Sequence, residues 1–140
     1  MVEDRLTRSL LEVLLPLLRR LNAERSVSAG KLGALRYLSE HGPATVSELA
    51  AAGHVSPQGM SLAVRELEGL RFVARLPDTE DRRRVWIQIT DAGQGKLVQE
   101  LAAGYGWLEQ SVSRQLTPQE RAVLEAAVPV LRKLAAASDE

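Results

Sequence analysis

Apolar residues recur at helical spacing through both ends of this chain and change their spacing only in the middle. Near the N-terminus the leucines fall on two neighbouring helical stripes, at positions 10, 14, 17 and 21 and at positions 11, 15 and 18. A helix that packs once against a small domain needs one apolar stripe, so two stripes predict a second covering surface, most simply another copy of the chain. The alternative is a helix buried inside one monomer, for which a chain of 140 residues leaves little room.

Two more helices with surplus apolar surface are predicted after residue 90. Thr90 or Asp91 can cap the first, while Thr117 and Glu120 form a capping signal for the second around a first-turn proline. We therefore expect residues 1–27 and 91–140 to be dimerisation helices. The residues expected at the contact between the two copies are Leu10, Leu14, Leu17, Val128 and Leu131.

Between these ends, shorter apolar repeats broken by turn signals predict a compact module over residues 30–90. A helix around Leu35 ends at Gly42-Pro43, a short helix follows from about residue 46 to 52, and Pro57 begins another that runs to about residue 70. Two short helices joined by a tight turn form a helix-turn-helix unit. His54 stands where most such turns carry glycine, and histidine tolerates positive φ, so we expect the turn to form.

The spacing then changes to the alternation that is typical of strands. Val85, Ile87 and Ile89 alternate with their neighbours, and a shorter run around Val73 precedes them. Residues 77–83 are too many for a two-residue turn, so they are expected to project as a long hairpin tip. A helix-turn-helix followed by a hairpin is a winged helix. The predicted fold class is therefore mainly α (α+β), a winged helix-turn-helix domain with long N- and C-terminal dimerisation helices.

Composition narrows the function classes. The 140 residues, 45% of them hydrophobic, fit one domain over residues 1–140. With no cysteine and only two histidines, the sequence excludes a disulfide framework, a thiol nucleophile and an ordinary zinc cluster. It also lacks a nucleophile-base pair and a phosphate loop, so we expect neither an enzyme nor a cofactor or metal. Arg19 and Arg20 end the leucine-rich run before it could span a membrane, and a cytoplasmic protein is expected.

Charge is balanced over the whole chain, with 18 basic and 18 acidic residues, but three arginines are consecutive in the predicted hairpin tip. A neutral total says nothing against a local basic patch, because phosphate contact depends on where the charge lies. The simplest interpretation of such a run is solvated surface whose field the neighbouring acids largely cancel. The alternative is a surface that binds an anionic partner.

The stretch from Leu49 through "VSPQGMSLAVRELEGLRFVAR" to "PDTEDRRRVWIQITDAG" resembles the MarR family of bacterial transcriptional regulators. The wing pattern of that family is Asp-x-x-Asp-x-Arg, several residues, then Leu-Thr-x-x-Gly; here Asp78, Asp81 and Arg83 precede "ITDAG", with isoleucine for leucine. The resemblance covers nearly the whole chain. It implies a homodimeric repressor that binds a pseudo-palindromic operator in double-stranded DNA and is released by a small molecule, often an aromatic or phenolic anion.

The resemblance also assigns roles in the wing. An arginine at a wing tip can enter the narrow minor groove while an aspartate two residues earlier orients its guanidinium through a bidentate pair. By resemblance Arg83 is the groove arginine and Asp81 is its holder, with Arg82 and Arg84 beside the phosphates. Arg84 can equally pair with an acid of the same subunit.

The N-terminal part of the helix that begins at Pro57 is expected to face the major groove. Its candidate contacts are Ser56, Pro57, Gln58, Ser61 and Arg65, with Gln58 suited to adenine and Arg65 to guanine or phosphate. The structural alternatives are that Ser56 only caps the helix and that Arg65 only forms an ion pair with Glu48, Glu66 or Glu68.

Ligands of the family lodge between the dimerisation helices and the winged domain. For an anionic ligand, Arg19, Arg20 and Tyr37 are candidate anchors; the structural alternatives are a salt bridge for the arginines and a core position for the tyrosine. A second functional hypothesis is a winged-helix protein-interaction module, whose wing arginines would meet an acidic partner without direct DNA readout.

Overall fold

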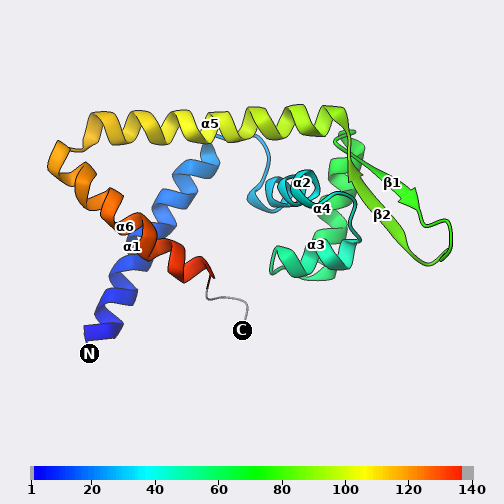
Figure 1. Cartoon of the computed structure of the whole chain (residues 1–140), viewed down its shortest axis with the longest axis horizontal. Helices are drawn as coiled ribbons and strands as arrows, with labels where there is room; N and C mark the ends of the chain where they lie inside the picture. The colour runs from blue at the N-terminus through cyan, green and yellow to red at the C-terminus, as the bar shows by residue number, and fades with distance from the viewer. Residues whose placement is uncertain (1, 137–140) are drawn as a thin grey trace. The chain divides into compact units, whose positions relative to one another are not determined.

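The computed structural model describes the backbone of residues 2–136 and the side chains of residues 5–136. The described chain is mostly helical with one two-stranded antiparallel sheet, which confirms the predicted fold class. In chain order, as Figure 1 labels them, the elements are α1 (Val2–Ala23), α2 (Ala29–His41), α3 (Val46–Ala52), α4 (Pro57–Gly69), β1 (Val73–Pro77), β2 (Val85–Ile89), α5 (Asp91–Gln115) and α6 (Pro118–Ala136).

Capping side chains set the starts of the last two helices. The Thr90 hydroxyl accepts a hydrogen bond from the Gly93 N–H at 3.0 Å, so Thr90 caps α5. At α6 the Thr117 N–H donates to the Glu120 carboxylate at 2.9 Å, and the Glu120 N–H donates to the Thr117 hydroxyl at 3.2 Å. This reciprocal pair satisfies two N–H groups that the helix itself leaves without acceptors, and it confirms the predicted capping signal.

The hydrophobic core lies among α2, α3, α4 and β2. Its fully buried side chains are Leu35, Leu38, Leu49, Val64, Leu67 and Ile87. Leu97 of α5 joins the same cluster at 5% exposure and so ties the start of that helix to the core. Truncating a buried leucine to alanine typically costs about 2–5 kcal/mol, so this cluster supplies much of the free energy that holds the helix-turn-helix unit together.

The turn between α3 and α4 forms as predicted. His54 adopts a positive φ of 53°, the conformation that glycine usually supplies at this place. Ala50 and Met60 are buried where the two helices meet, and the Val55 N–H donates to the Ala50 carbonyl at 3.1 Å. The small Ala50 side chain lets the helices approach, and this closeness fixes the direction of α4.

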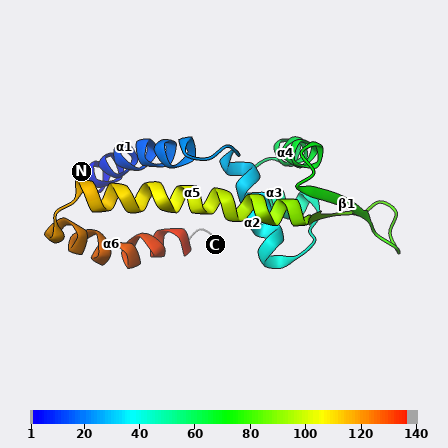
Figure 2. The same ribbon diagram turned by 90° about the horizontal axis from the view of Figure 1, so that it is seen from above.

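The wing is the antiparallel pair β1 and β2, in register from Val73 opposite Ile89 to Pro77 opposite Val85. Figures 1 and 2 both show this hairpin extending away from α2, α3 and α4. Ala44 adds a short third contribution to the sheet, because its N–H and carbonyl both bond to Ile87, at 3.0 and 2.7 Å. The hairpin is thus fixed to the segment just before α3.

The base of the wing is packed backbone against backbone. A Cβ atom added to Gly93 would lie 2.1 Å from the Phe72 carbonyl oxygen, so only glycine fits there. That carbonyl accepts the Thr90 N–H at 3.0 Å, and the Thr90 hydroxyl donates to the carbonyl of Arg71 at 2.7 Å. Arg71 itself has a positive φ of 66°. These contacts join the end of α4, the strands and the start of α5.

A buried carboxylate joins the loop before α2 to α5. Glu100, only 3% exposed, accepts hydrogen bonds from the N–H and hydroxyl of Ser26 and lies 3.1 Å from the Lys96 ammonium. Burial acts to raise the pKa of Glu100, but the Ser26 hydrogen bonds and the Lys96 charge outweigh it, and the pKa lies below its usual value of 4.5. The carboxylate therefore stays charged and keeps this connection.

The chain divides into two compact units, residues 1–104 and residues 105–140. In the first unit α1 exposes several leucines, among them Leu17 at 47%; in the second, α6 buries none of its residues and exposes Val128 and Leu131. Large contiguous apolar surfaces on soluble proteins usually mark interaction sites. None of the described helices is long and apolar enough to cross a bilayer.

Candidate nucleic-acid interface

The start of α4 presents polar side chains from a capped helix end. Ser56 caps the helix: its hydroxyl oxygen accepts the Gly59 N–H at 3.0 Å. A hydroxyl that accepts one bond still has a proton to donate, so the cap leaves Ser56 able to bond to a phosphate. Pro57 and Gln58 are exposed beside it, and Ser61 is half-buried one turn later.

Arg65, on the exposed side of α4, has no internal ion-pair partner among residues 5–136. Two of the three acids considered for it are engaged elsewhere: Glu66 pairs with Lys31, and Glu68 pairs with Arg75 at 3.0 Å. The guanidinium of Arg65 is exposed. It can therefore bind an external acceptor without breaking an internal salt bridge.

Asp78 organises the wing tip. One of its carboxylate oxygens accepts the N–H groups of Glu80 and Asp81, at 2.8 and 3.2 Å, and the other accepts the indole N–H of Trp86 at 3.1 Å. The Asp78 N–H donates to the carbonyl of Arg84 at 3.1 Å and closes the tip. The hydrogen bonds that the carboxylate accepts, from the Glu80 N–H first and then from Asp81 and Trp86, and the nearby charge of Arg84 hold the pKa of Asp78 below its usual 3.8.

Asp81 contacts Arg83 through one carboxylate oxygen. That oxygen accepts the backbone N–H of Arg83 at 3.0 Å and lies 3.4 Å from its side-chain Nε. Asp81 therefore contacts the Arg83 side chain, but through one oxygen only and not as the expected bidentate pair, because its other oxygen does not reach the guanidinium. The Arg83 side chain is 93% exposed and extends into solvent, where it is available to an external anion.

Arg82 and Arg84 flank Arg83 and are both exposed. The guanidinium carbon of Arg84 lies 5.4 Å from the centroid of the Trp86 ring, a cation–π contact. Among the described residues Arg84 forms no ion pair, but its charge lowers the pKa of Asp78, so an acid of the same chain still attracts it. Its immediate support is an aromatic face.

An open groove of about 710 Å³ runs between the wing tip and the start of α3. The wing contributes Asp81, Arg83 and Arg84 among its lining residues, and the α3 side contributes Thr45, Ser47 and Glu48. No sequence pattern indicated these α3 residues as parts of the site, because they become neighbours of the wing only through the pairing of Ala44 with Ile87. Two hydroxyl-bearing residues thus line the groove together with two arginines.

The comparisons with known proteins agree with this geometry. Residues 17–85 match the model of the MarR family. The HTH-type transcriptional repressor MdtR of Bacillus subtilis is 33% identical over 116 residues, which are 83% of this chain and 72% of that protein. This chain belongs to the MarR family. It is a transcriptional regulator with a DNA-binding winged-helix fold, and not an enzyme.

Solved MarR-family structures share the fold over almost the full chain. Apo wild-type MarR of E. coli superposes with a TM-score of 0.75 at 25% identity, covering 92% of this chain and 96% of that one. Bordetella bronchiseptica BpsR, whose structure concerns the regulation of its DNA binding by 6-hydroxynicotinic acid, gives a TM-score of 0.66 at 23% identity, covering 91% and 98%. The second likeness concerns the fold alone.

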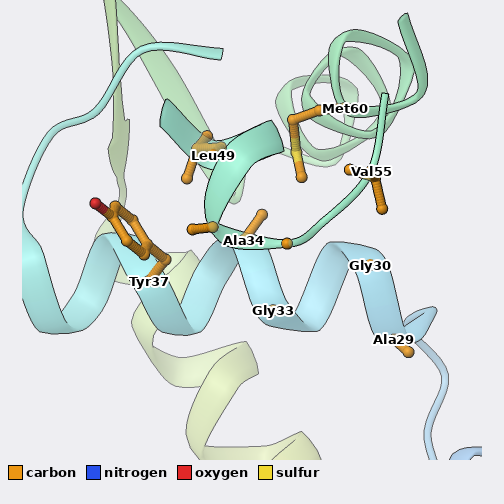
Figure 3. Close-up of a pocket in the computed structure, with 10 residues that line it drawn as sticks. Ala29, Gly30, Gly33, Ala34, Tyr37, Leu49, Val55 and Met60 are labelled. Atoms are coloured by element: carbon orange, nitrogen blue, oxygen red, sulfur yellow. The ribbon is translucent and has the colours of Figure 1, made fainter. Parts of the chain in front are cut away.

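The candidate ligand anchors of this MarR-family chain lie in different surroundings. Tyr37 lines a pocket of about 430 Å³ between α2 and the helix-turn-helix, and Figure 3 shows it on the α2 face that also carries Gly30 and Gly33. Its ring stacks on His41 at 4.3 Å between centroids. Arg20 pairs with Glu24 at 3.1 Å, Arg19 is exposed, and the residues lining this pocket include neither arginine.

Proposed function

We propose that this protein is a homodimeric, sequence-specific repressor that binds a pseudo-palindromic operator. The observation that carries the proposal is the wing tip, where Arg82, Arg83 and Arg84 are exposed together while the Asp78 carboxylate is engaged by N–H donors of its own turn. Among the described residues the acids of the tip form one ion pair with these arginines, the exposed contact of Asp81 with Arg83 at 3.4 Å. A cluster of this kind suits the negative potential of a narrow minor groove and its flanking phosphates.

The recognition helix supplies the second contact. α4 is directed by its packing on α3 and exposes Gln58 and Arg65 about two turns apart on one side of the helix. A glutamine amide can bond in bidentate fashion to adenine, and an unpaired arginine to guanine or to phosphate. The wing would then supply affinity and shape readout, and α4 would supply sequence readout.

Binding of duplex DNA from the protein's own promoter region, measured by fluorescence anisotropy over a range of salt concentrations, tests the proposal. The logarithm of the affinity should fall linearly with the logarithm of salt, with a slope of about −0.9 for each phosphate neutralised. Footprinting on the same DNA should protect two half-sites. A salt-independent interaction, or preferential binding of an acidic protein in competition with the duplex, would favour the protein-interaction module instead.

The homodimer rests on the exposed apolar residues of α1 and α6. Leu10 and Leu14 are half-buried on the helix that exposes Leu17, and α6 exposes Val128 and Leu131. An arginine at Leu14 should dissociate or unfold the protein in sedimentation experiments at micromolar concentration. Leu62→Arg is the matched control, because Leu62 is equally apolar and 52% exposed but lies on α4. A parent protein that sediments as a stable folded monomer would contradict the homodimer.

Release by a small anionic aromatic molecule completes the proposal. The family resemblance supports it, as does the regulation of DNA binding by 6-hydroxynicotinic acid in BpsR. Arg19, Arg20 and Tyr37 remain the proposed anchors. Titrating 6-hydroxynicotinate into the protein–DNA complex should lower the anisotropy, and Tyr37→Phe should shift that titration only if its hydroxyl contacts the ligand.

A further inference from the structure

Trp86 makes two contacts with residues of the wing tip. The edge of its indole donates to Asp78 Oδ2 at 3.1 Å, and the face of the ring lies 5.4 Å from the guanidinium carbon of Arg84. The ring is half-buried at the penultimate cross-strand position of the hairpin, opposite Leu76. One side chain therefore connects the polar turn of the tip to one particular arginine.

The orientation of this ring is determined by the backbone of the turn. Asp78 Oδ1 is occupied by the N–H groups of Glu80 and Asp81, which leaves Oδ2 for the indole N–H. A tryptophan whose N–H is held at one point and whose ring lies on a strand has few rotamers left. The hydrogen-bonded turn thus fixes Asp78, Asp78 fixes the Trp86 ring, and the ring restricts the position of the Arg84 guanidinium.

An exposed arginine is normally free to adopt many rotamers and loses that freedom when it binds. A cation–π contact with a fixed ring reduces the loss, because the guanidinium is ordered before the partner arrives. Among the described residues the Arg84 guanidinium donates no hydrogen bond, so its N–H groups remain available to a phosphate. Arg84 lines the groove that it shares with Thr45 and Ser47, whose hydroxyls are further donors.

We propose that Trp86 is a positioning residue that orders Arg84 for contact with a DNA phosphate in the groove between the wing and α3. This inference rests on the proposed DNA-binding function and deepens it. It assigns different tasks to neighbouring arginines. Arg83 extends into solvent with one contact to Asp81, whereas Arg84 lies over the Trp86 ring and is ordered for the backbone of the duplex.

A double-mutant cycle on operator DNA tests the proposal, with Arg84→Ala, Trp86→Leu and the double variant. Arg84→Ala should reduce the magnitude of the salt slope by about 0.9, the loss of one phosphate contact. Trp86→Leu should weaken binding about two- to fivefold, the usual range for an exposed cation–π contact. In the Arg84→Ala background, Trp86→Leu should have no further effect, since the residue acts through that arginine.

Arg82→Ala provides the control cycle, because Arg82 is an exposed neighbour of the same charge and the cation–π contact of the ring is with Arg84. Its effect should add to that of Trp86→Leu. Trp86→Phe, which keeps an aromatic face but loses the N–H, should retain part of the affinity. Melting temperatures are measured for each variant, and Trp86→Val, which also suits a strand, replaces Trp86→Leu if the leucine variant does not fold.

The outcomes separate this inference from the function on which it rests. If Trp86→Leu weakens binding equally with and without Arg84, Trp86 only supports the fold of the wing and the proposal is overturned. The same holds if Trp86→Leu binds as tightly as the parent while Arg83→Ala loses affinity. If neither Arg83→Ala nor Arg84→Ala changes DNA binding, the proposed function of the wing fails first.

Discussion

The base and the tip of the wing keep their shapes by different means. At the base, Gly93 approaches the Phe72 carbonyl so closely that an added Cβ would lie 2.1 Å from it, and Thr90 bonds to two carbonyls nearby. At the tip, a single carboxylate, Asp78, gathers three N–H donors while the arginines beside it remain exposed. At the base, therefore, no side chain larger than that of glycine fits at position 93. At the tip, the arginine side chains are exposed and available to a partner.

This difference explains why the wing pattern of the sequence contains both a glycine at its end and arginines at the tip. The final glycine of "ITDAG" is required by packing, because any side chain there would meet backbone atoms that cannot move aside. The exposed arginines of the tip contribute little to the packing of the fold, and their value lies in what they present to a partner. Changes at the two ends should therefore affect different measurements.

Gly93→Ala should have the largest effect, and on stability. Because the added methyl group meets the Phe72 carbonyl and the Ile89 side chain, the free energy of unfolding should fall by about 3 kcal/mol, at the upper end of overpacking costs. Gly95→Ala is the matched control: no atom lies within 4 Å of its Cβ, and alanine should raise helix stability by up to about 1 kcal/mol. Urea denaturation at equal protein concentration measures both. Equal stability of the Gly93→Ala variant and the parent would contradict the packing argument.

The elements that local patterns encode could be predicted from the sequence. The helix-turn-helix and the hairpin follow from apolar spacing and turn residues, and the positive φ of His54 follows from its place in the turn. The pairing of Ala44 with Ile87 could not be predicted in this way, nor could the Ser26–Glu100 connection, which joins residues 74 positions apart. Such contacts depend on how elements meet in space, and no short stretch of sequence encodes them.

The candidate site divides in the same manner. The residue types at the wing tip and on α4 were evident from the sequence, and the family resemblance indicated the contact of Asp81 with Arg83, but the other partners were not evident. Glu66 forms an ion pair with Lys31 of α2, and Glu68 forms one with Arg75 of β1. Neither acid is therefore available to Arg65. Likewise, the roles of Asp78 and Trp86 emerge only when the two strands are paired.

At the tip, Arg83→Ala should change DNA binding and leave stability within about 0.5 kcal/mol of the parent, since the side chain is 93% exposed. If this arginine enters the minor groove, it reads groove width more than base identity, so affinity should fall by a similar factor for every operator variant. The expected loss is about 1.5–3 kcal/mol, typical of a charged hydrogen bond. A panel of single-base operator variants measures it. Parent-like affinity would make the tip arginines ordinary surface charge.

Gln58→Ala should give a more selective effect on the same panel. If its amide meets a base edge, the cost should be about 1–3 kcal/mol at one base position in each half-site, with little change for variants already altered there. A two-fold symmetric dimer requires the effect to appear twice, with half-site centres roughly 10 base pairs apart or a multiple of that. A uniform loss across the panel would instead assign Gln58 to phosphate contact.

Acidification should loosen the tip before it disturbs the base, and this is the smallest effect expected. Asp78 has a folded pKa below its usual 3.8, so its carboxylate stabilises the tip above the unfolded-state pKa, and that contribution is lost as the pH falls through the folded value. The indole N–H resonance of Trp86, which bonds to Asp78, should titrate with a midpoint below 3.8, and Asp78→Asn should abolish the titration. A midpoint at or above 3.8 would mean that the backbone N–H groups of the tip do not hold this carboxylate in solution. The turn that bears the arginines would then be less ordered in solution than the hydrogen bonds of Asp78 predict.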